Sequence, residues 1–369
     1  MGYIVECQET MGNQVYWITN SDTLALDKLS SKYLKHKTNL HRSPNSVRSI
    51  AYALSYYLTF LEKNNMSIVD VFKLQYADQY AHFSDFLSWL KRGEHCATKK
   101  RPKNNTCNAY LAAVLGFLMF AVYEDVVDEG LKVYRGRDMT YYNSAGVRSR
   151  QYVYRFDGYL PKNEHRSRTM AGNNLIKLIN ACTCIRNKLM LMLLAETGLR
   201  IGELLGVDYT KDIDFENRCI WVKFREDNEN DARAKNGEYR AVYFSGETLD
   251  LLNTYIADNA EYLSGTKYLF INLHGKTAGK PMTVNGVYSF LAILEKTTGI
   301  ESTPHMLRHY FARERLKAGW ELIEISTALG HKHIHTTEVY LGIADEDIEN
   351  VSDHYYEQHQ ALYDIRKLI

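Results

Sequence analysis

The chain has 369 residues, enough for two domains that each bury a core, and its formal charge is only +1. Its longest nearly uncharged stretch has about 14 residues, too few for a membrane-spanning helix, and its six cysteines show no paired CxxC spacing, which indicates the reduced thiols of a cytoplasmic protein. The charge is uneven, because residues 1–170 hold 23 Lys and Arg against 16 Asp and Glu, whereas residues 171–369 hold 22 against 28. The N-terminal half is therefore the half expected to grip a polyanion.

The first 130 residues predict a small hairpin followed by a helical bundle. Residues 3–18 alternate weakly and contain the turn-like Met11-Gly12-Asn13, which favours a short β-hairpin. Residues 1–40 are open to two interpretations, an accessory DNA-binding arm or a structural cover for the bundle. From Ser43, a predicted N-cap, apolar residues recur at helical spacing, and further helical runs follow at about 76–90 and 106–123. We expect an all-α bundle over residues 41–130.

Residues 131–170 lack a sustained apolar period and interleave basic residues with tyrosines. Such a stretch between two domains suits an extended basic linker that lies along DNA phosphates, and an ordinary solvated linker is the alternative. Together with the basic segment before the last helix of the bundle, it supplies the residues predicted to bind DNA. These are Lys99, Lys100, Arg101, Lys103, Arg135, Arg137, Arg148, Arg150, Arg166 and Arg168.

Residues 171–345 predict a mixed domain. Helical patterns at 173–181 and 186–196 precede two strand-like runs, 219–224 and 239–244, which flank a long polar loop. Helical patterns resume at about 245–259, 284–298, 304–318 and 321–329, and Gly319 and Gly330 stand where helix C-caps are expected. The predicted fold class of the whole chain is therefore mainly α with a small antiparallel β-sheet (α+β).

Four short segments of this domain carry side chains suited to phosphodiester chemistry. They are TGLRIGEL around Arg200, TPHMLRH with His305 and Arg308, LGHK with His331, and the Tyr340 that follows nine residues later. The non-bridging oxygens of a phosphodiester gain charge as phosphorus becomes five-coordinate, so fixed positive donors aimed at them lower the barrier. Arginine suits this role because its planar fork can donate twice and stays charged. Arg200 and Arg308 are the candidate phosphate ligands.

Attack on the phosphorus also needs a nucleophile and an acid. Tyr340 is the candidate nucleophile, because a phosphotyrosyl bond conserves the energy needed to rejoin the strand. The leaving 5′ oxygen needs a proton, and Lys235 in the polar loop is the candidate acid, with Lys223 in the preceding strand as its competitor. The HKHIH run at 331–335 lacks a nearby Cys or carboxylate that would complete a ligand set, so we expect no metal site.

The order and wording of these segments resemble those of the tyrosine recombinases, the phage-integrase family of DNA strand-exchange enzymes. The resemblance covers residues 174–345 with high specificity. It extends with lower specificity to residues 43–125, which resemble the family's core-binding domain. The catalytic set that the resemblance implies is Arg200, Lys235, His305, Arg308, His331 and Tyr340, with Glu203 as the acidic residue that supports Arg200, and every position of the set is filled.

The resemblance also implies an activity. It predicts a site-specific DNA recombinase, an integrase or transposase of a mobile element rather than a chromosome-dimer resolvase. This enzyme would cleave and rejoin strands through a 3′-phosphotyrosyl intermediate, with no metal, nucleotide or other cofactor. Two alternatives stay open, a type IB topoisomerase-like enzyme that relaxes DNA as a monomer and a catalytically silent DNA-binding protein of architectural role.

The partners follow from the same resemblance. We expect double-stranded DNA with inverted half-sites, a homotetramer on that DNA, accessory recombination proteins, and no membrane. The acidic tail, residues 346–369, is predicted to contact a neighbouring protomer. The predicted location is the bacterial cytoplasm, in association with the nucleoid.

Overall fold

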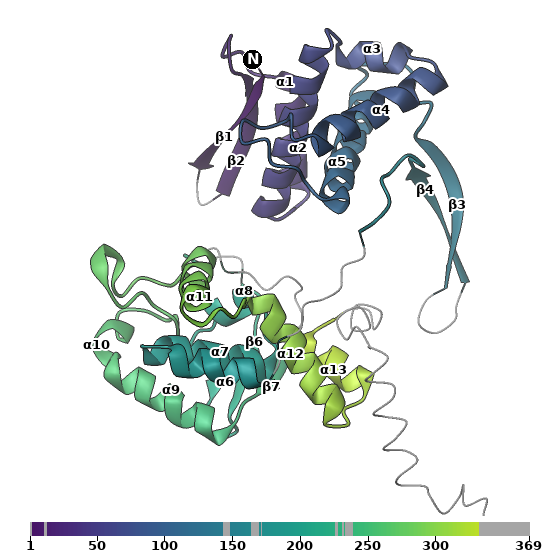
Figure 1. Cartoon of the computed structure of the whole chain (residues 1–369). Helices are drawn as coiled ribbons and strands as arrows, with labels where there is room; N and C mark the ends of the chain where they lie inside the picture. Colours follow the sequence, from purple (N-terminus) through teal and green to yellow (C-terminus); the bar gives the residue numbers. More distant parts are fainter. Residues whose placement is uncertain are drawn as a thin grey trace, which may run out of the picture. The chain divides into compact units, whose positions relative to one another are not determined.

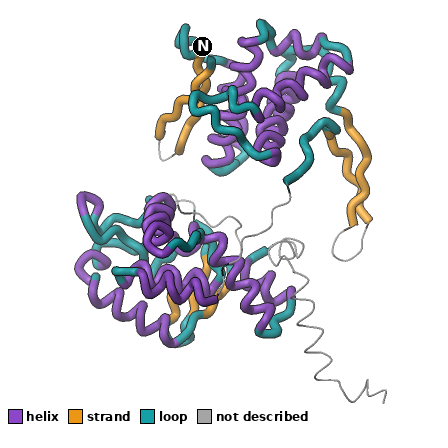
Figure 2. The backbone as a smooth tube through the Cα atoms, viewed as in Figure 1, coloured by secondary structure: helices purple, strands orange, loops and turns teal. Residues whose placement is uncertain are grey.

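The computed structural model describes residues 2–10, 13–142, 148–163, 170, 172–225, 228–230, 232 and 239–331. The chain divides into two compact units, Met1–Glu164 (unit 1) and His165–Ile369 (unit 2). Both are mainly helical and carry small antiparallel sheets, as Figure 1 and Figure 2 show, which confirms the predicted fold class. Four predicted functional residues lie outside the described part of the chain, namely Arg166, Arg168, Lys235 and Tyr340.

Unit 1 is built around two long helices. α2 (Pro44–Lys63) and α5 (Asn104–Tyr123) pack against each other and supply much of the core. α2 begins where the sequence predicts, because the Ser43 hydroxyl accepts a hydrogen bond from the Ser46 N–H at 3.3 Å and a proline occupies the first turn. The other helices of the unit are α1 (Lys28–Asn39), α3 (Ile68–Lys73) and α4 (Tyr76–Lys91).

α5 is the one described helix that is long and apolar enough, by length and composition alone, to cross a membrane. Central helices of globular bundles have the same composition. In unit 1, Leu111, Val114 and Leu118 of this helix are fully buried among the side chains of the neighbouring helices. α5 is therefore a core helix of unit 1.

A hairpin at the N-terminus covers the helices of unit 1. β1 (Tyr3–Thr10) and β2 (Asn13–Asn20) pair antiparallel, and both pack on α2. The Tyr3 N–H donates to Thr59 Oγ1 at 2.9 Å, and the Asn20 amide donates to Glu62 Oε1 at 2.8 Å. Ile18 is fully buried. These contacts favour the structural cover over the DNA-binding arm for the first forty residues.

The stretch expected to be an extended linker is largely folded. β3 (Arg135–Tyr142) and β4 (Arg148–Arg155) form an antiparallel hairpin, and unit 1 continues to residue 164. The linker prediction is therefore wrong for residues 131–163. It failed because neither strand sequence, RGRDMTYY or RSRQYVYR, alternates apolar with polar residues, and this alternation is the sequence signal of a half-buried strand.

Unit 2 surrounds α7 (Ile185–Thr197), which packs against α6 (Gly172–Ala181), α9 (Gly246–Asp258) and α12 (Pro304–Lys317). Its antiparallel sheet has the order β5 (Ile213–Asp214), β6 (Cys219–Val222), β7 (Arg240–Tyr243), so the two predicted strands are present. The remaining elements are α8 (Ile201–Leu205), α10 (Ala260–Leu263), the 3₁₀ turn η1 (Gly275–Thr277), α11 (Val284–Thr298) and α13 (Leu322–Leu329).

Candidate active site

A sharp turn between α7 and α8 places the first candidate residue. α7 ends at Gly198, whose φ of 64° is left-handed, and a Cβ at that position would lie 2.6 Å from the Phe311 ring and 2.8 Å from Leu329. Only glycine satisfies both constraints. The turn makes Arg200 the N-cap residue of α8, and its backbone N–H donates to Glu203 Oε2 at 2.9 Å. The sequence TGLR thus fixes the backbone of Arg200 at the start of a helix.

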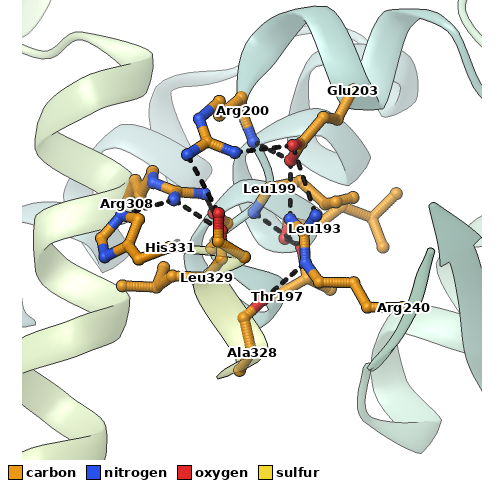
Figure 3. Close-up of polar contacts among 12 residues, drawn as sticks. Leu193, Thr197, Leu199, Arg200, Glu203, Arg240, Arg308, Ala328, Leu329 and His331 are labelled. Atoms are coloured by element: carbon orange, nitrogen blue, oxygen red, sulfur yellow. Dashed lines mark hydrogen bonds and ion pairs between the residues drawn. The ribbon is translucent and has the colours of Figure 1, made fainter. Parts of the chain in front are cut away.

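Glu203 is an acceptor shared by two arginines. Its side chain is only 1% exposed, and it accepts from Arg200 Nη1 at 2.9 Å and from Arg240 Nη2 at 2.7 Å (Figure 3). Burial by itself would raise the pKa of Glu203, but the charge and hydrogen bonds of Arg240, and then those of Arg200, hold that pKa below its usual value. Glu203 is therefore a buried carboxylate that orients two guanidinium groups.

Arg308 comes from α12 and is 2% exposed. Its Nη1 donates to the carbonyl oxygen of Gly198 at 2.6 Å, and its Nη2 donates to that of Leu329 at 2.7 Å. A buried guanidinium needs acceptors of this kind, because an unpaired charge in the interior is strongly unfavourable. The two bonds tie α12 to the ends of α7 and α13.

The end of α13 gathers arginines from three different elements. α13 closes in a Schellman motif, in which Gly330 (φ 64°) and His331 donate their N–H groups to the carbonyls of Thr327 and Ser326, both at 3.0 Å. The following carbonyl oxygens have no partner within the helix, and they stand at the negative end of its dipole. Ala328 O accepts from Arg240 Nε at 2.8 Å, Leu329 O from Arg308 Nη2 at 2.7 Å, and Gly330 O from Arg200 Nη2 at 3.4 Å (Figure 3).

His331 follows directly on this helix end. Its Nε2 lies 2.9 Å from Arg308 Nη2, and since arginine only donates, Nε2 accepts and the imidazole is neutral. Burial, followed by the charges of Arg308, Arg200 and Arg240, lowers the pKa of His331 to about 3. Three arginines and the single carboxylate Glu203 give this cluster a net charge of +2. A cationic, partly buried cluster of this kind can hold a phosphodiester anion.

His305 lies in the first turn of α12, three residues before Arg308, and is exposed. The Thr303 hydroxyl caps that turn by accepting from the Met306 N–H at 3.2 Å. His309 is 3% exposed, and its ring centre lies 4.5 Å from that of His305. His309 is therefore a packed histidine. Within the described residues no group of three His, Cys, Asp or Glu side chains is placed as metal ligands would be.

The structure engages Lys223, the competing lysine, in another contact. Its Nζ lies 3.0 Å from Asp212 Oδ1, and the same carboxylate accepts from Arg225 at 2.6 and 2.8 Å. Asp212 is 1% exposed, so Lys223 is paired with a buried carboxylate of unit 2. Lys235 and Tyr340 lie outside the described residues, and their placement stays a prediction.

Eight of the ten predicted DNA-binding residues are described, and they lie in two places of unit 1. Lys99, Lys100, Arg101 and Lys103 are exposed on the loop between α4 and α5. Arg148 and Arg150 are exposed on β4, and Arg135 and Arg137 belong to β3.

Arg240 is the member of the cluster that the sequence analysis missed. Its signal was a register argument, because residues two apart in a strand share a face. Val242 is buried, so Arg240 on the same face of β7 is an inward-pointing charge, and such a charge implies a partner. The partner, Glu203, is 37 residues away in the sequence, and the motif around Arg200 gave no hint of it.

Comparisons with known proteins agree with this geometry. Residues 168–347 match the model of the phage integrase family. Transposase A from transposon Tn554 of Staphylococcus aureus is 27% identical over 342 residues, which cover 89% of this chain and 90% of that protein. Tyrosine recombinase XerA of Saccharolobus solfataricus is 38% identical over 176 residues, which cover 47% of this chain and 52% of that protein.

Solved structures share the fold. The Tn1549 transposon integrase in complex with a circular intermediate DNA aligns with a TM-score of 0.60 and 17% identity, over 89% of this chain and 98% of that chain. A lambda integrase dimer bound to a core site aligns with a TM-score of 0.57 and 14% identity, over 85% and 93%. At these identities the likeness concerns the fold alone.

Fold, site and relatives together define an enzyme that transfers DNA strands. The chain belongs to the phage integrase family and is a tyrosine recombinase. The family predicted from the segments around Arg200, Arg308 and His331 is thereby confirmed, and so is the predicted activity of site-specific DNA recombination. The topoisomerase-like and catalytically silent alternatives are not favoured.

Proposed function

We propose that this recombinase is the integrase or transposase of a mobile element, and that Arg200, Arg308 and His331 hold the phosphate it cleaves. The observation that carries the proposal is the convergence of these three residues at the C-terminus of α13. Arg200 is the donor most open to a ligand. Its side chain is 22% exposed, and its bonds to Glu203 and Gly330 O leave further N–H groups of the guanidinium available. The similarity to the Tn554 transposase supports the mobile-element role.

In the proposed reaction the phenol oxygen of Tyr340 attacks the phosphorus. The bond between phosphorus and the 5′ oxygen breaks, and the phosphate stays attached to the 3′ strand end through tyrosine. His305, exposed in the first turn of α12, is the proposed acceptor of the phenol proton, and Lys235 is the proposed donor of the proton to the 5′ oxygen. One phosphoester bond replaces another, so the step runs backward when a new 5′ hydroxyl attacks, and no nucleotide is consumed.

The contacts of Lys223 support Lys235 as the acid. Lys223 is held by the buried Asp212 at 3.0 Å and also donates to the Lys211 carbonyl at 3.3 Å. A lysine that leaves this contact to protonate DNA would give up one of the two cationic partners of a buried carboxylate, with Arg225 as the other, and this loss is unfavourable.

The proposed partner is double-stranded DNA with inverted half-sites, bound by a homotetramer with accessory recombination proteins. In this proposal residues 41–130 act as the core-binding domain, residues 171–345 as the catalytic domain, and the tail 346–369 contacts a neighbouring protomer. The bacterial cytoplasm, in association with the nucleoid, is the proposed location, and the relatives from bacteria and an archaeon support a cytoplasmic enzyme.

The covalent intermediate is the direct test. Nicked suicide substrates made from the DNA that flanks the gene are incubated with the full chain in EDTA, and a denaturing gel reports protein attached to the DNA 3′ end. We expect an adduct from the wild type and none from Tyr340→Phe. The matched control is Tyr288→Phe, which alters an exposed tyrosine on α11 and should leave the adduct unchanged.

Single-site variants then divide the roles. Arg200→Ala should slow adduct formation by about a thousandfold, because a transition-state arginine in phosphoryl transfer is worth roughly 4 kcal/mol. Lys235→Ala should form little adduct with the normal substrate. Adduct formation should be restored by a substrate whose 5′ bridging oxygen is replaced by sulfur, because a sulfur leaving group needs no proton. Rescue of Lys223→Ala instead of Lys235→Ala would move the acid to Lys223, and equal adduct from Tyr340→Phe would refute the mechanism.

The tail has its own test. Deletion of residues 346–369 should prevent assembly of the tetramer on DNA, measured by light scattering, while single-site binding persists. A truncated protein that still assembles on two half-sites would contradict the proposed role of the tail.

A further inference from the structure

The hairpin of β3 and β4 projects from unit 1 (Figure 1), and none of its described side chains belongs to the core of the unit. Its strands pair with each other over eight residues each, and among the described residues neither strand packs extensively on a helix. A lone two-stranded ribbon is marginally stable in water. The ribbon therefore needs an explanation other than packing.

Both ends of the ribbon are held by the core of unit 1. Before β3, the Val133 N–H donates to Gln79 Oε1 at 3.0 Å. After β4, Phe156 is fully buried among core aromatic rings. Asn108 then accepts from the Leu160 N–H at 2.9 Å and donates to the Leu160 carbonyl at 2.8 Å. These contacts fix the direction in which the ribbon leaves unit 1. A flexible linker between domains would not have a fixed direction.

The charge of the ribbon is strongly one-signed. Its two strands contain five arginines and one aspartate. Arg135 lies directly opposite Arg155 in the register, and like charges in opposite positions of an antiparallel pair are destabilising. Arg148 and Arg150 are exposed on β4. An anionic partner would relieve this repulsion, which indicates that the ribbon binds a polyanion.

The register distributes these arginines over both faces of the ribbon. Directly opposite residues share a face, and successive residues alternate between faces. Arg135, Arg137 and Arg155 therefore belong to one face near the base, whereas Arg148 and Arg150 belong to the other face near the far end. A ribbon lying on a single phosphate strand would need charge on one face only. Charge on both faces suits a groove whose two walls are phosphate strands.

We propose that the β3–β4 ribbon enters the major groove of duplex DNA, the partner that the proposed function already requires. A ribbon with side chains on both faces is about 10 Å thick, the spacing at which sheets pack. The major groove of B-form DNA is about 12 Å wide and the minor groove about 6 Å, so only the major groove admits it. Double-stranded RNA fits poorly, because its major groove is deep and narrow.

Tyrosines on the ribbon are consistent with this placement. Tyr152 and Tyr154 are 62% and 44% exposed. A Cβ at Gly136 would overlap the ring of Tyr152, so the glycine lets that ring lie across the neighbouring strand. Exposed aromatic rings add apolar contact with base edges and sugars to the charge contact with phosphates.

The first test is the salt dependence of DNA binding by the full chain. Arg148→Gln/Arg150→Gln is compared with Lys28→Gln/Lys35→Gln, which removes the same charge from exposed positions of α1 on the other side of unit 1 (Figure 1). On random-sequence duplex, the ribbon variant should lower the slope of log K against log salt by about 1 to 2, because each phosphate contact contributes about 0.9. The α1 variant and the charge-conserving Arg148→Lys/Arg150→Lys should keep the wild-type slope. A ribbon variant with the wild-type slope would overturn the inference.

The second test identifies the groove. Dimethyl sulfate methylates guanine N7 in the major groove and adenine N3 in the minor groove. On the duplex that forms the covalent adduct, N7 methylation at a few positions should weaken DNA binding by the wild type. Methylation at the same positions should not change DNA binding by the ribbon variant. Interference at adenine N3 that is lost in the ribbon variant would place the ribbon in the minor groove and refute the proposal. If the ribbon variant keeps its DNA affinity but loses binding to duplex RNA, the partner is RNA and the proposal fails.

The two proposals fail separately. A wild-type chain that binds no DNA and forms no adduct contradicts the proposed function. If the wild type binds DNA and forms the adduct, and the ribbon variant behaves in the same way, only the inference about the ribbon is contradicted.

Discussion

Replacing Arg240 with methionine removes the residue that links Glu203 to the end of α13. Arg240 Nη2 donates to Glu203 Oε2 at 2.7 Å and Arg240 Nε donates to Ala328 O at 2.8 Å. The side chains of Arg240 and Glu203 are 8% and 1% exposed, so little solvent screens the pair. In the variant Glu203 keeps Arg200, whose side chain and backbone N–H both donate to it at 2.9 Å. The carboxylate stays charged, but it loses the stronger of its two cationic partners.

These contacts allow an estimate of the stability that unit 2 loses in Arg240→Met. Removing one partner of a buried ion pair destabilises a protein by about 3–5 kcal/mol, and the surviving contacts with Arg200 place this case near 3 kcal/mol. For a unit of about 200 residues, 3 kcal/mol corresponds to roughly 6–12 °C in Tm. Without Arg240 the orientation of Arg200 is less constrained, and misplacement by about 1 Å costs about a hundredfold in rate. We therefore expect slower adduct formation with little change in DNA affinity.

Hydrogen exchange with mass spectrometry measures the effect unit by unit. Peptides from α7 and α13 should lose about 3 kcal/mol of protection in Arg240→Met, a value that follows from the same buried-pair estimate. Peptides from α2 and α5 of unit 1 provide an internal control and should keep their protection. The pKa of Glu203 is depressed in the folded protein, so its contribution to stability is present above the unfolded pKa of about 4.3 and is lost as the pH falls through the folded pKa. Arg240→Met raises that folded pKa towards the unfolded value, so the loss of stability in acid should be smaller and should be complete at a higher pH.

A double-mutant cycle decides whether the buried charge is the cause. Glu203→Gln alone removes the carboxylate partner of Arg240, and Arg240→Met alone removes one cationic partner of Glu203. The double variant leaves neither of these two charges in the interior. It should therefore be about 1–3 kcal/mol more stable than the sum of the two losses predicts. Strictly additive losses, or a single-variant loss below about 1 kcal/mol, would refute the reasoning from the buried pair.

Three further predictions concern the backbone of unit 2, the titration of His331 and a loop of unit 1. Gly330→Ala should destabilise unit 2 by more than Gly299→Ala, measured by thermal melting, because both residues are left-handed (φ 64° and 70°) but only at Gly330 does a Cβ meet a guanidinium. Burial and the nearby arginines lower the pKa of His331 to about 3, so its NMR signals should not titrate between pH 5 and 8. Because its folded pKa lies below its unfolded pKa, its contribution to the stability of unit 2 is present above about pH 6.5 and declines below that pH. A titration near pH 6.5 would contradict the proposed arginine cluster. Asn108→Ala should remove about 2 kcal/mol, at about 1 kcal/mol for each of the two hydrogen bonds to Leu160, and faster exchange confined to residues 156–163 should accompany it; unchanged exchange there would show that these bonds do not hold the segment.

The helices were predictable where local signals and burial agree. α11 matches its predicted range because Thr283 caps its start and Gly299, with a φ of 70°, ends it. α12 begins at Thr303 and Pro304, two residues whose chemistry suits an N-terminus. The β3–β4 hairpin was not predictable by the same means. Its strands contain arginines and tyrosines but no regular alternation of apolar and polar residues, and hydrophobic periodicity detects only strands that cover a core.

The candidate site shows the same division. The local wording around Arg200, Arg308 and His331 identified these residues, because each stands at a helix end that the sequence marks with glycine or an N-cap. The sequence could not show that their guanidinium groups share one helix end. Arg308 reaches back 110 residues to the carbonyl of Gly198, and Arg240 reaches 88 residues forward to that of Ala328. Contacts at such separations arise only when the core of unit 2 brings α7, α12 and α13 together.

The arginines at the end of α13 bind backbone carbonyl oxygens, so the identity of the side chains there can vary. At the end of α13 the acceptors are backbone atoms of Ala328, Leu329 and Gly330, so the side chains at 328 and 329 do not hold the arginines. What matters is the residue at which the helix stops. If α13 continued for one more turn, these carbonyls would accept N–H groups of the helix itself, and the arginines would lose their acceptors. The Schellman turn at Gly330 therefore aims the proposed phosphate ligands as much as any side chain does.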